Sequence, residues 1–343
     1  MNAPSRQRRY QLTRQPAGNY TLKSTEASVP AVGEHDVLIR VRAVSLNRRD
    51  VYLVKGQYPM PPRDVLVPLS DGAGEVTAVG AKVTRFRVGD RVVPIFFQRW
   101  LRGRPDAATI GSALGGQLDG VLAEFVSLNE EGVVGLPGGY SFEEGATLPC
   151  AGVTAWNGLV TRGRMQAGDF VLLLGTGGVA VFGLQFAVAA GARPIITSSS
   201  DAKLARAKSL GAVGTVNYAK TPQWAESVRA ATGGSGVHQV LEVGGVGTLP
   251  QSLASLAPGG HVALIGGLAG FGGDIPARAL FGNNATASGI YVGSRENFEA
   301  MNSFIERHRV RPVIDRVFEY AEAATAYDYV EKGQHFGKVV IRV

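Results

Sequence analysis

The 343-residue sequence predicts an α/β protein in which a β-rich domain precedes a doubly wound parallel-sheet domain. Up to about residue 150, short runs of alternating apolar and polar residues are interrupted by glycine and proline, which is typical of a compact barrel-like domain. Beyond residue 150, apolar strands alternate with helical segments, and this alternation indicates βαβ units around a parallel sheet. The chain ends on an apolar run that can rejoin the first domain as a strand.

Three runs predict strands in the first domain. The run DVLIRVRAVSL alternates apolar and polar residues, as a half-buried strand does. The run GEVTAVGAKVTRFRVGDRVV contains two short strands around glycine-containing turns, and GVLAEFVSL predicts another strand. This part of the chain is therefore expected to be β-rich.

The second domain begins with the run DFVLLLGTGGVAVFGLQFAVAAGA, which predicts an apolar strand, a glycine-rich turn and a helix. The next strand, RPIITS, leads into a helix with Ser200 as its N-cap, Asp201 in its first turn and Gly211 at its C-terminal end. A third strand, GTVNY, precedes a helix that we expect to open at Pro222. The runs VHQVLEVGG and HVALIGGL predict further buried strands.

Composition excludes several classes of protein. Hydrophobic residues make up 45% and charged residues 18% of the chain, as in soluble globular proteins. Cys150 is the only cysteine, which excludes an internal disulfide. No apolar run approaches the roughly 20 residues of a membrane span, and the basic start MNAPSRQRRYQL lacks the apolar stretch of a signal peptide. We therefore expect a cytoplasmic protein.

The formal net charge of +7 leaves two interpretations open. Lysine and arginine are scattered, the longest cluster is RQRR at Arg6–Arg9, and there is no zinc-finger spacing or basic heptad helix, so nucleic-acid binding is not favoured. The excess of positive charge could serve to bind a phosphorylated small ligand, or it could belong to a basic surface that has no partner.

The turn after the first strand of the second domain predicts a dinucleotide site. It reads LLLGTGGVA, a G-x-G-G-x-A pattern in which one glycine allows the tight turn, another lets a pyrophosphate approach the backbone, and Ala180 lets helix pack on strand. The helix start would receive the phosphates. A merely structural glycine turn is the alternative, but the strand and helix on either side favour binding. The predicted loop residues are Gly175, Thr176, Gly177, Gly178 and Val179.

The end of the second strand of this domain favours NADPH over NADH. NAD sites place Asp or Glu there to accept from the ribose 2′-hydroxyl. This chain has Ser198 and Ser199, with Lys203 one turn onward, and these groups suit a 2′-phosphate. Asp201 is the one carboxylate nearby, and its position fits a helix N-terminal charge better.

These motifs together resemble the medium-chain dehydrogenase/reductase superfamily, on its zinc-independent, quinone oxidoreductase-like and alcohol dehydrogenase-like side. The resemblance covers nearly the whole chain and follows the family's order through SLNRRDVY, GQYP, LSDGAGEVTAVG, VTRFRVGDRV, ATLPCAGVTAW, GTGGVA, AKSLGA, VNY and FGKVVI. It implies a GroES-like catalytic domain at residues 1–150, completed by residues 291–343. It also implies a Rossmann NADP(H)-binding domain at residues 151–290.

The resemblance also bears on metal binding. The positions that hold catalytic zinc in the family's zinc enzymes correspond here to Asn47, Ser70 and Cys150, so one good ligand remains where zinc normally needs three. The stretch FFQRWLRGRPDAATIGSALGGQLDG, which takes the place of the four-cysteine structural lobe, has no cysteine. We expect no metal. Cys150 is expected to be a small packing residue near the nicotinamide end, because no histidine lies nearby in sequence to activate a nucleophile.

Loss of zinc favours reduction of enones or quinones, because the developing charge spreads over a conjugated system and hydrogen-bond donors suffice to stabilise it. Asn47 and Tyr52 are the candidate catalytic donors, Tyr52 because the resemblance places it beside the substrate; an ordinary packed aromatic is its alternative. Arg48 or Arg49 could reach the pyrophosphate, and a solvated surface arginine is the alternative for either. Asp50 and Asp71 are expected to orient neighbours, and Trp100 is either a substrate-loop residue or a core aromatic.

Further cofactor contacts follow from matched positions in the resemblance. Thr154, Tyr291 and Val292 are expected near the nicotinamide, and Tyr218 near the adenosine phosphate. The remaining expected contacts border the cofactor after later strands or close the cleft from the C-terminal segment: Val243, Gly244, Gly266, Phe336 and Lys338.

The sequence therefore predicts an NADPH-dependent oxidoreductase that acts on an enone or quinone. A metal-free alcohol/ketone dehydrogenase, a non-catalytic NADPH-binding sensor and an RNA-binding reductase remain as alternatives. The late run NATASGIYVG resembles the edge through which the family's Rossmann domains pair, so a homodimer is expected.

Overall fold

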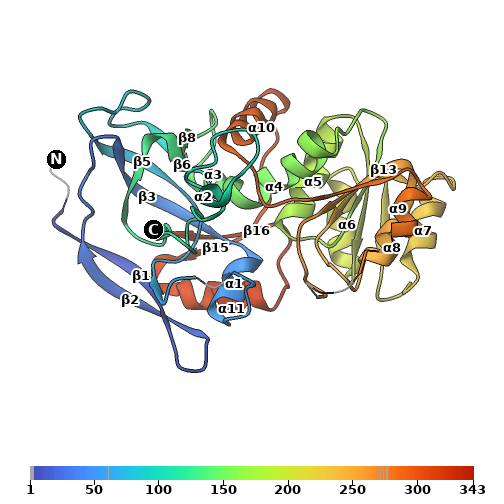
Figure 1. Ribbon diagram of the computed structural model, residues 1–343, viewed down its shortest axis with the longest axis horizontal. Coiled ribbons are helices and arrows are strands. Elements are labelled where there is room, and N and C mark those ends of the chain that lie inside the picture. Colours follow the sequence, from blue (N-terminus) through green and yellow to red (C-terminus); the bar gives the residue numbers. More distant parts are fainter. Residues whose placement is uncertain (1–3, 61, 271, 273, 276) are drawn as a thin grey trace. The chain divides into compact units, whose positions relative to one another are not determined.

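The computed structural model describes residues 4–60, 62–270, 272, 274–275 and 277–343, and it is an α/β protein (Figure 1). The chain forms two compact units: unit 1 comprises Met1–Ala151 with Gly293–Val343, and unit 2 comprises Gly152–Val292. The division after Ala151 falls within the short helix η2 (Leu148–Gly152). The predicted fold class, a β-rich domain together with a doubly wound parallel sheet, is confirmed.

Unit 1 contains a seven-stranded sheet in which the end of the chain pairs with its first third. Its strand order is β15-β16-β3-β5-β6-β8, and β7 also pairs with β3. The C-terminal strand β16 is antiparallel to β3, with Val339 opposite Leu46, so residues from both ends of the chain share one core. The bounds are β3 (Asp36–Leu46), β5 (Asp71–Val79), β6 (Arg91–Pro94), β7 (Phe125–Asn129), β8 (Val133–Gly135), β15 (Ile314–Glu319) and β16 (Lys338–Arg342).

A second, three-stranded sheet of unit 1 was missed by the sequence analysis. Its order is β2-β1-β4, with β1 (Arg6–Arg14), β2 (Tyr20–Ser28) and β4 (Val65–Leu66). The basic cluster RQRR lies on β1 and hides the alternation there, because Gln7 is buried beside exposed arginines. Arg6 pairs with Glu26 and Arg8 with Glu124, so two arginines of this cluster form ion pairs within the unit.

The helices of unit 1 cover its sheets, and α1 lies beside α11 (Figure 1). Helix α1 starts after Asn47, whose backbone N–H donates to the Asp50 carboxylate at 2.7 Å. This hydrogen bond from the backbone to a side chain one turn later satisfies one of the free N–H groups at the helix start. The bounds are α1 (Arg48–Val54), α2 (Ala107–Ile110), η1 (Glu130–Gly132), α3 (Phe142–Ala146), α10 (Arg295–His308), η4 (Tyr320–Glu322) and α11 (Ala323–Glu331).

Unit 2 contains a six-stranded parallel sheet in the order β11-β10-β9-β12-β13-β14. If the strands are numbered by their place in the chain, this order is 3-2-1-4-5-6, the order of dinucleotide-binding Rossmann sheets. All the strands are parallel, but the order in which they are added to the sheet reverses between β9 and β12. Ligands of such sheets bind beyond the carboxyl ends of the strands at that reversal. The bounds are β9 (Phe170–Leu173), β10 (Arg193–Ser198), β11 (Gly214–Asn217), β12 (Val237–Glu242), β13 (Leu256–Leu264) and β14 (Thr286–Gly289).

The helices of unit 2 begin close to where the sequence predicts. Ser200 caps α6 by accepting from the Lys203 N–H, and Gly211 follows the helix with φ 100°, as predicted. Pro222 does not open the next helix, because α7 begins at Trp224, two residues later. The bounds are α4 (Val153–Trp156), η3 (Asn157–Arg162), α5 (Gly178–Ala189), α6 (Asp201–Ser209), α7 (Trp224–Ala231), α8 (Leu249–Ala254) and α9 (Ala277–Phe281).

No helix within the described part of the chain is both long and apolar enough to cross a lipid bilayer.

Candidate functional site

The glycine turn of unit 2 has the geometry that a phosphate-binding loop requires. Gly175 has φ 74°, a conformation that favours glycine, and its N–H donates to Thr197 Oγ1 at 3.2 Å, which ties the turn to β10. A Cβ built on Gly175 or Gly177 would meet nothing within 4 Å, so open space lies beside this backbone. Gly178 and Val179 start α5, whose N-terminal N–H groups suit an anion. The turn therefore fits a dinucleotide pyrophosphate.

Close packing of α5 on the sheet depends on a residue that the sequence analysis missed. Ala180 is buried, as a small residue at that position should be. However, Gly183 is the glycine at which an added Cβ would lie 2.6 Å from Leu241 and 2.9 Å from Leu173. Both leucines are fully buried, so they have little freedom to move away. A second small residue is thus required one helical turn after Ala180.

The predicted ribose-end residues lie together where β10 and β11 end. Ser198 is buried and its Oγ accepts from the Ser200 N–H at 3.2 Å, while Ser199 is exposed. Tyr218 is largely exposed, and its N–H donates to the Ser198 carbonyl at 3.1 Å. Lys203 follows in the first turn of α6. Ser198, Ser199, Lys203 and Tyr218 thus all lie at one corner of the sheet.

Asp201 is already engaged by other side chains at this corner. Its carboxylate accepts from Asn217 Nδ2 at 2.7 Å and from Lys220 Nζ at 2.6 Å. The hydrogen bond from Lys220, followed by that from Asn217, lowers the pKa of Asp201. The carboxylate that the sequence analysis set aside is therefore ionised and held by two donors from the β11 end of the sheet.

A buried glutamate that the sequence analysis did not single out fixes the loop after β12. The Glu242 carboxylate accepts from the backbone N–H groups of Gly244 at 2.7 Å and Gly245 at 3.1 Å. It also accepts from Thr248 Oγ1 at 2.6 Å and from the Ser252 hydroxyl. Four donors satisfy this buried charge, and they hold Val243 and Gly244 at the carboxyl end of β12. Gly266 lies opposite, since a Cβ there would be 2.9 Å from the Val243 carbonyl oxygen.

The residues expected near the nicotinamide occupy a constrained part of unit 2. Thr154 is buried on α4. Val292 has φ 56°, which is unusual for a β-branched residue, and its carbonyl accepts from Asn157 Nδ2 at 2.7 Å. Strained backbone of this kind persists only where its surroundings hold it. Tyr291, half-buried, precedes it.

Unit 1 contains a buried cluster of charged and polar side chains around Lys338. Lys338 Nζ donates to the Leu46 carbonyl at 2.7 Å and to Asn47 Oδ1 at 2.6 Å, and it lies 3.8 Å from Asp71 Oδ2. Asp71 in turn accepts from the Ser70 hydroxyl at 2.7 Å and from the Cys150 N–H at 3.2 Å. The side chains of Lys338 and Asp71 are only 3% and 0% exposed, so the pair is shielded from solvent.

Burial sets the protonation of this cluster. It raises the pKa of Asp71, while the Lys338 ammonium and hydrogen bonds from Asn47 and Ser70 oppose that rise. Burial of the Cys150 thiol, with a contribution from the Asp71 carboxylate, raises the pKa of Cys150 well above its ordinary range. A nucleophilic cysteine needs a thiolate, so this environment agrees with the packing interpretation of Cys150.

The three positions compared with zinc ligands do not form a zinc site. Asn47 and Ser70 are engaged by Lys338 and Asp71, and an ammonium lies among the donor atoms where a metal would need free lone pairs. Within the described residues, no three His, Cys, Asp or Glu side chains are grouped so that they could hold a metal ion. The residues present therefore do not fit a catalytic zinc.

The remaining predicted residues of unit 1 are placed as follows. Arg48 donates to the carbonyls of Val330 at 3.2 Å and Glu331 at 2.9 Å, at the end of α11, and its guanidinium lies 5.5 Å from the centre of the Tyr52 ring. This is the contact of a cation with a helix C-terminus. Tyr52 is half-buried on α1, while Phe336 is fully buried just before β16.

Arg49 and Trp100 are core residues of unit 1. Arg49 is buried, donates to the Leu114 carbonyl at 2.9 Å and lies 4.7 Å from the centre of the Phe96 ring. Trp100 is buried and donates through its ring nitrogen to the Gly103 carbonyl at 3.0 Å. The structure therefore favours the core interpretation of Trp100 over the substrate-loop one.

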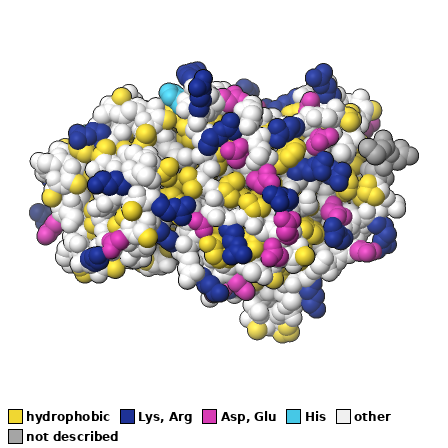
Figure 2. Space-filling model, turned by 180° about the vertical axis from the view of Figure 1, so that it is seen from behind, with side chains coloured by type: hydrophobic (Ala, Val, Ile, Leu, Met, Phe, Trp, Pro, Cys, Tyr) yellow, Lys and Arg dark blue, Asp and Glu magenta, His cyan; other side chains and the backbone are white. Residues whose placement is uncertain are grey.

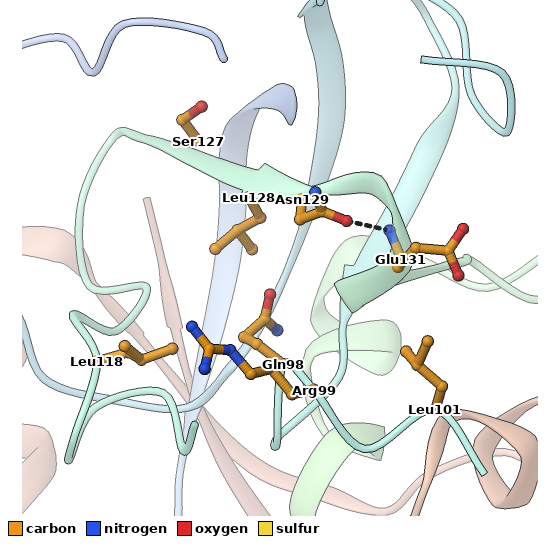
Figure 3. Close-up of a pocket in the computed structure, with 8 residues that line it drawn as sticks. All are labelled: Gln98, Arg99, Leu101, Leu118, Ser127, Leu128, Asn129 and Glu131. Carbon is orange, nitrogen blue, oxygen red and sulfur yellow. Dashed lines mark hydrogen bonds between the residues drawn. The ribbon is translucent and has the colours of Figure 1, made fainter. Parts of the chain in front are cut away.

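A separate hollow of about 460 Å³ in unit 1 holds none of the predicted site residues (Figure 3). Several of its polar groups are already bonded: the Gln98 amide donates to the Ile95 carbonyl, and Asn129 Oδ1 accepts from the Glu131 N–H at 3.0 Å. Its lining consists of Gln98, Arg99, Leu101, Leu118, Ser127, Leu128, Asn129 and Glu131.

Surface charge gives no sign of a nucleic-acid interface on the face seen in Figure 2. Lysine and arginine side chains there are interspersed with aspartate and glutamate and do not gather in one patch. The net positive charge is therefore dispersed on this face.

Comparison with protein families gives two adjacent matches. Residues 33–138 match the family described as an alcohol dehydrogenase GroES-like domain, and residues 178–307 match the family described as a zinc-binding dehydrogenase. The first match lies in unit 1, and the second covers most of unit 2 together with α10.

Individual proteins are similar over nearly the full chain. A zinc-type alcohol dehydrogenase-like protein of Schizosaccharomyces pombe is 45% identical over 98% of this chain and 99% of its own length. A quinone oxidoreductase of Pseudomonas aeruginosa is 33% identical over 90% of this chain and 91% of its own. A solved NAD-dependent alcohol dehydrogenase is 34% identical, with a TM-score of 0.87 over 98% of this chain and 99% of its own.

Asp50 gives a testable pH dependence. Burial raises its pKa from 3.8 to about 6, against the lowering effect of Arg49. The folded state thus holds the proton more tightly than the unfolded chain, so ionised Asp50 lowers stability as the pH rises from about 4 through 6, and the full cost remains above that range. Asp50→Asn should therefore raise the free energy of unfolding at pH 7.5 by about 1–3 kcal/mol.

The measurement is urea unfolding of both proteins between pH 4 and pH 8. The asparagine oxygen can still accept from the Asn47 N–H, so the helix start is preserved. The gain should shrink toward pH 4. A stability difference that is the same across this range would show that Asp50 is not ionising in the folded protein as described.

Proposed function

This chain belongs to the medium-chain dehydrogenase/reductase superfamily, and from that premise we propose that it transfers hydride from NADPH to a conjugated carbonyl compound, an enone or a quinone, without a metal ion. The observation that carries the proposal is the occupation of the metal-ligand positions by a lysine-centred cluster. NADPH supplies the hydride, a proton comes from water, and the products are NADP⁺ and the saturated ketone or the hydroquinone.

The choice of acceptor follows from the charge that the reaction develops. Addition of hydride to a simple ketone concentrates negative charge on one oxygen, which a metal ion would stabilise as a Lewis acid. Addition to an enone or quinone spreads the charge over a conjugated anion, which hydrogen-bond donors can stabilise. Unit 1 offers donors but no zinc ligand set among its described residues. We assign Asn47 and Tyr52 as the donors to the acceptor oxygen.

Contacts at the ribose end support NADPH. A 2′-phosphate would meet Ser198, Ser199 and Lys203, while the Asp201 carboxylate is engaged by Lys220 and Asn217. The solved alcohol dehydrogenase that resembles this chain is described as NAD-dependent. The assignment of NADPH to this chain therefore rests on its own side chains. The other predicted contacts of unit 2 follow the carboxyl ends of its strands.

A metal-free alcohol/ketone dehydrogenase is the second candidate. The name of the 45% identical relative, a zinc-type alcohol dehydrogenase-like protein, favours the alcohol/ketone reaction but not the absence of a metal. Both candidates need the same nucleotide site, and they differ in whether a simple ketone is reduced as readily as an enone of the same size.

The proposed function is tested by NADPH oxidation with a panel of small enones, quinones and matched saturated ketones. We expect turnover with at least one conjugated acceptor, little or none with the matched ketones, and full activity after chelation. Elemental analysis of the same sample should find no stoichiometric zinc. One tightly held zinc per chain, or preferred reduction of saturated ketones, would contradict the proposal; tight NADPH binding without any turnover would favour a sensor.

Cofactor preference is tested with two substitutions. A charge-assisted hydrogen bond contributes about 1.5–3 kcal/mol, which corresponds to roughly ten- to a hundredfold in affinity. Lys203→Ala should therefore weaken NADPH by about that factor and leave NADH nearly unchanged. Ser198→Asp should go further, because its carboxylate would repel the phosphate. Fluorescence titrations at fixed ionic strength measure both nucleotides. Equal weakening of NADPH and NADH by Lys203→Ala would refute the phosphate assignment.

We also propose a homodimer formed through β14. This strand ends the sheet order and its outer edge carries backbone groups able to pair with a second chain. Phe281, just before it, is 74% exposed, which is unusual for so large an apolar side chain. Light scattering at micromolar concentration should give about twice the 36.1 kDa chain mass. A monomer under those conditions would count against this assembly.

The lone unpaired Cys150 suits a reducing compartment such as the cytoplasm.

A further inference from the structure

We infer that Lys338 is a positioning residue that fixes the Asn47 side-chain amide with its nitrogen directed to the reacting oxygen. The inference deepens the proposed function, on which it rests for the acceptor. Lys338 is a predicted cofactor contact, whereas its ammonium is bonded within unit 1 to Leu46 and Asn47.

The contact with Lys338 decides which way the amide points. An ammonium group can only donate hydrogen bonds, so the atom of Asn47 that lies 2.6 Å from Lys338 Nζ must be the carbonyl oxygen Oδ1. The opposite orientation would bring two donors together. Asn47 Nδ2 therefore lies on the other side of the amide, where it lies near enough to Asp71 to lower the pKa of that carboxyl.

That nitrogen carries two N–H groups, so its proximity to Asp71 leaves at least one of them available as a donor. Among the described residues, buried Asn47 Nδ2 has no partner at good hydrogen-bond geometry. A buried donor without an acceptor is unfavourable unless a ligand satisfies it. The developing enolate or quinone anion is such an acceptor, and its bond to an amide donor would be charge-assisted.

Lys338 is well suited to hold this orientation because it is itself fixed. Its side chain is almost fully buried, and a buried ammonium must keep its acceptors or lose stability. Its backbone lies on β16, which pairs with β3 so that Val339 faces Leu46 beside the start of α1. The Asp71 carboxylate, 3.8 Å away, balances its charge. A rotated amide would cost Lys338 one of its two direct hydrogen bonds.

A direct phosphate-binding role for Lys338 makes a different prediction. To reach a phosphate, the ammonium would have to give up acceptors at 2.6 and 2.7 Å. Its removal would then weaken NADPH binding. A positioning role instead lowers kcat through Asn47, with little change in the dissociation constant of NADPH.

A double-mutant cycle on kcat separates these roles. Lys338→Met and Asn47→Ala should each lower kcat for the best panel acceptor about 100-fold, the lower end of the loss caused by removing one oxyanion donor. The double variant should be no slower than the slower single variant, because Lys338 acts through Asn47. The NADPH dissociation constant should change less than about threefold. Multiplicative losses in kcat, or a dissociation constant raised more than tenfold with kcat intact, would overturn the inference.

Three companion variants separate the donor from general structure. Asn47→Asp keeps an acceptor for Lys338 but replaces the donor nitrogen with an oxygen that faces Asp71, so it should match the kcat of Asn47→Ala. Adding Asp71→Asn removes the repulsion between the two carboxylates, so this double variant should keep a melting temperature near wild type while kcat stays low. Lys338→Met with Asp71→Asn removes both buried charges, which guards against unfolding from an unpaired Asp71. The control is Lys82→Met, which removes an exposed lysine paired with Glu34 and should change nothing.

A readout without any acceptor keeps this inference separate from the proposed function. The Asn47 side-chain amide signal in ¹H–¹⁵N NMR spectra, assigned from its loss in Asn47→Asp, should be sharp in the wild type and shifted or broadened in Lys338→Met. An unchanged signal would refute the positioning role even if the enzyme reduces enones. If no acceptor in the panel is reduced but the signal responds, the proposed function fails and the positioning contact stands.

Discussion

A single buried ammonium, that of Lys338, joins segments of unit 1 that are far apart in the chain. Lys338 Nζ donates to Leu46 at the end of β3 and to Asn47, the residue that follows it. It also lies beside Asp71 at the start of β5. The Asp71 carboxylate in turn accepts from the Cys150 N–H. Because a buried charge must keep its partners, these segments cannot shift independently. The starts of α1 and β5 and the C-terminal strand therefore hold one arrangement of donors and acceptors.

Unit 2 also contains a buried carboxylate, that of Glu242, which holds several parts of the chain together through hydrogen bonds. The buried Glu242 carboxylate gathers donors from Gly244, Gly245 and Thr248 and so fixes the loop at the carboxyl end of β12. The glycine turn at Gly175 is tied to β10 through Thr197. Both loops flank the reversal of strand order, where Rossmann sheets bind ligands. In each unit a buried charge thus fixes backbone and side chains on which the proposed chemistry depends.

Local patterns in the sequence predict much of this fold, while contacts between distant residues escape them. The glycine turn, the Ser200 cap and the alternating strands are local, and the parallel sheet follows from them. Strand β1 was missed because its arginines mask the alternation, and Gly183 because its need for a small side chain comes from Leu173 and Leu241 on the sheet. The contact between Asn47 and Lys338 spans 291 residues, so no motif reveals it.

The central claim is that a lysine-held amide, and not a metal ion, meets the reacting oxygen. Its most direct test is a crystal structure of the protein with NADP⁺ and an unreactive acceptor analogue, collected with anomalous data at the zinc edge. The account predicts Asn47 Nδ2 within about 3 Å of the analogue's oxygen, with Lys338 still on Asn47 Oδ1 and no anomalous peak at the cluster. Zinc bound at Cys150, or Lys338 displaced onto a cofactor phosphate, would contradict it.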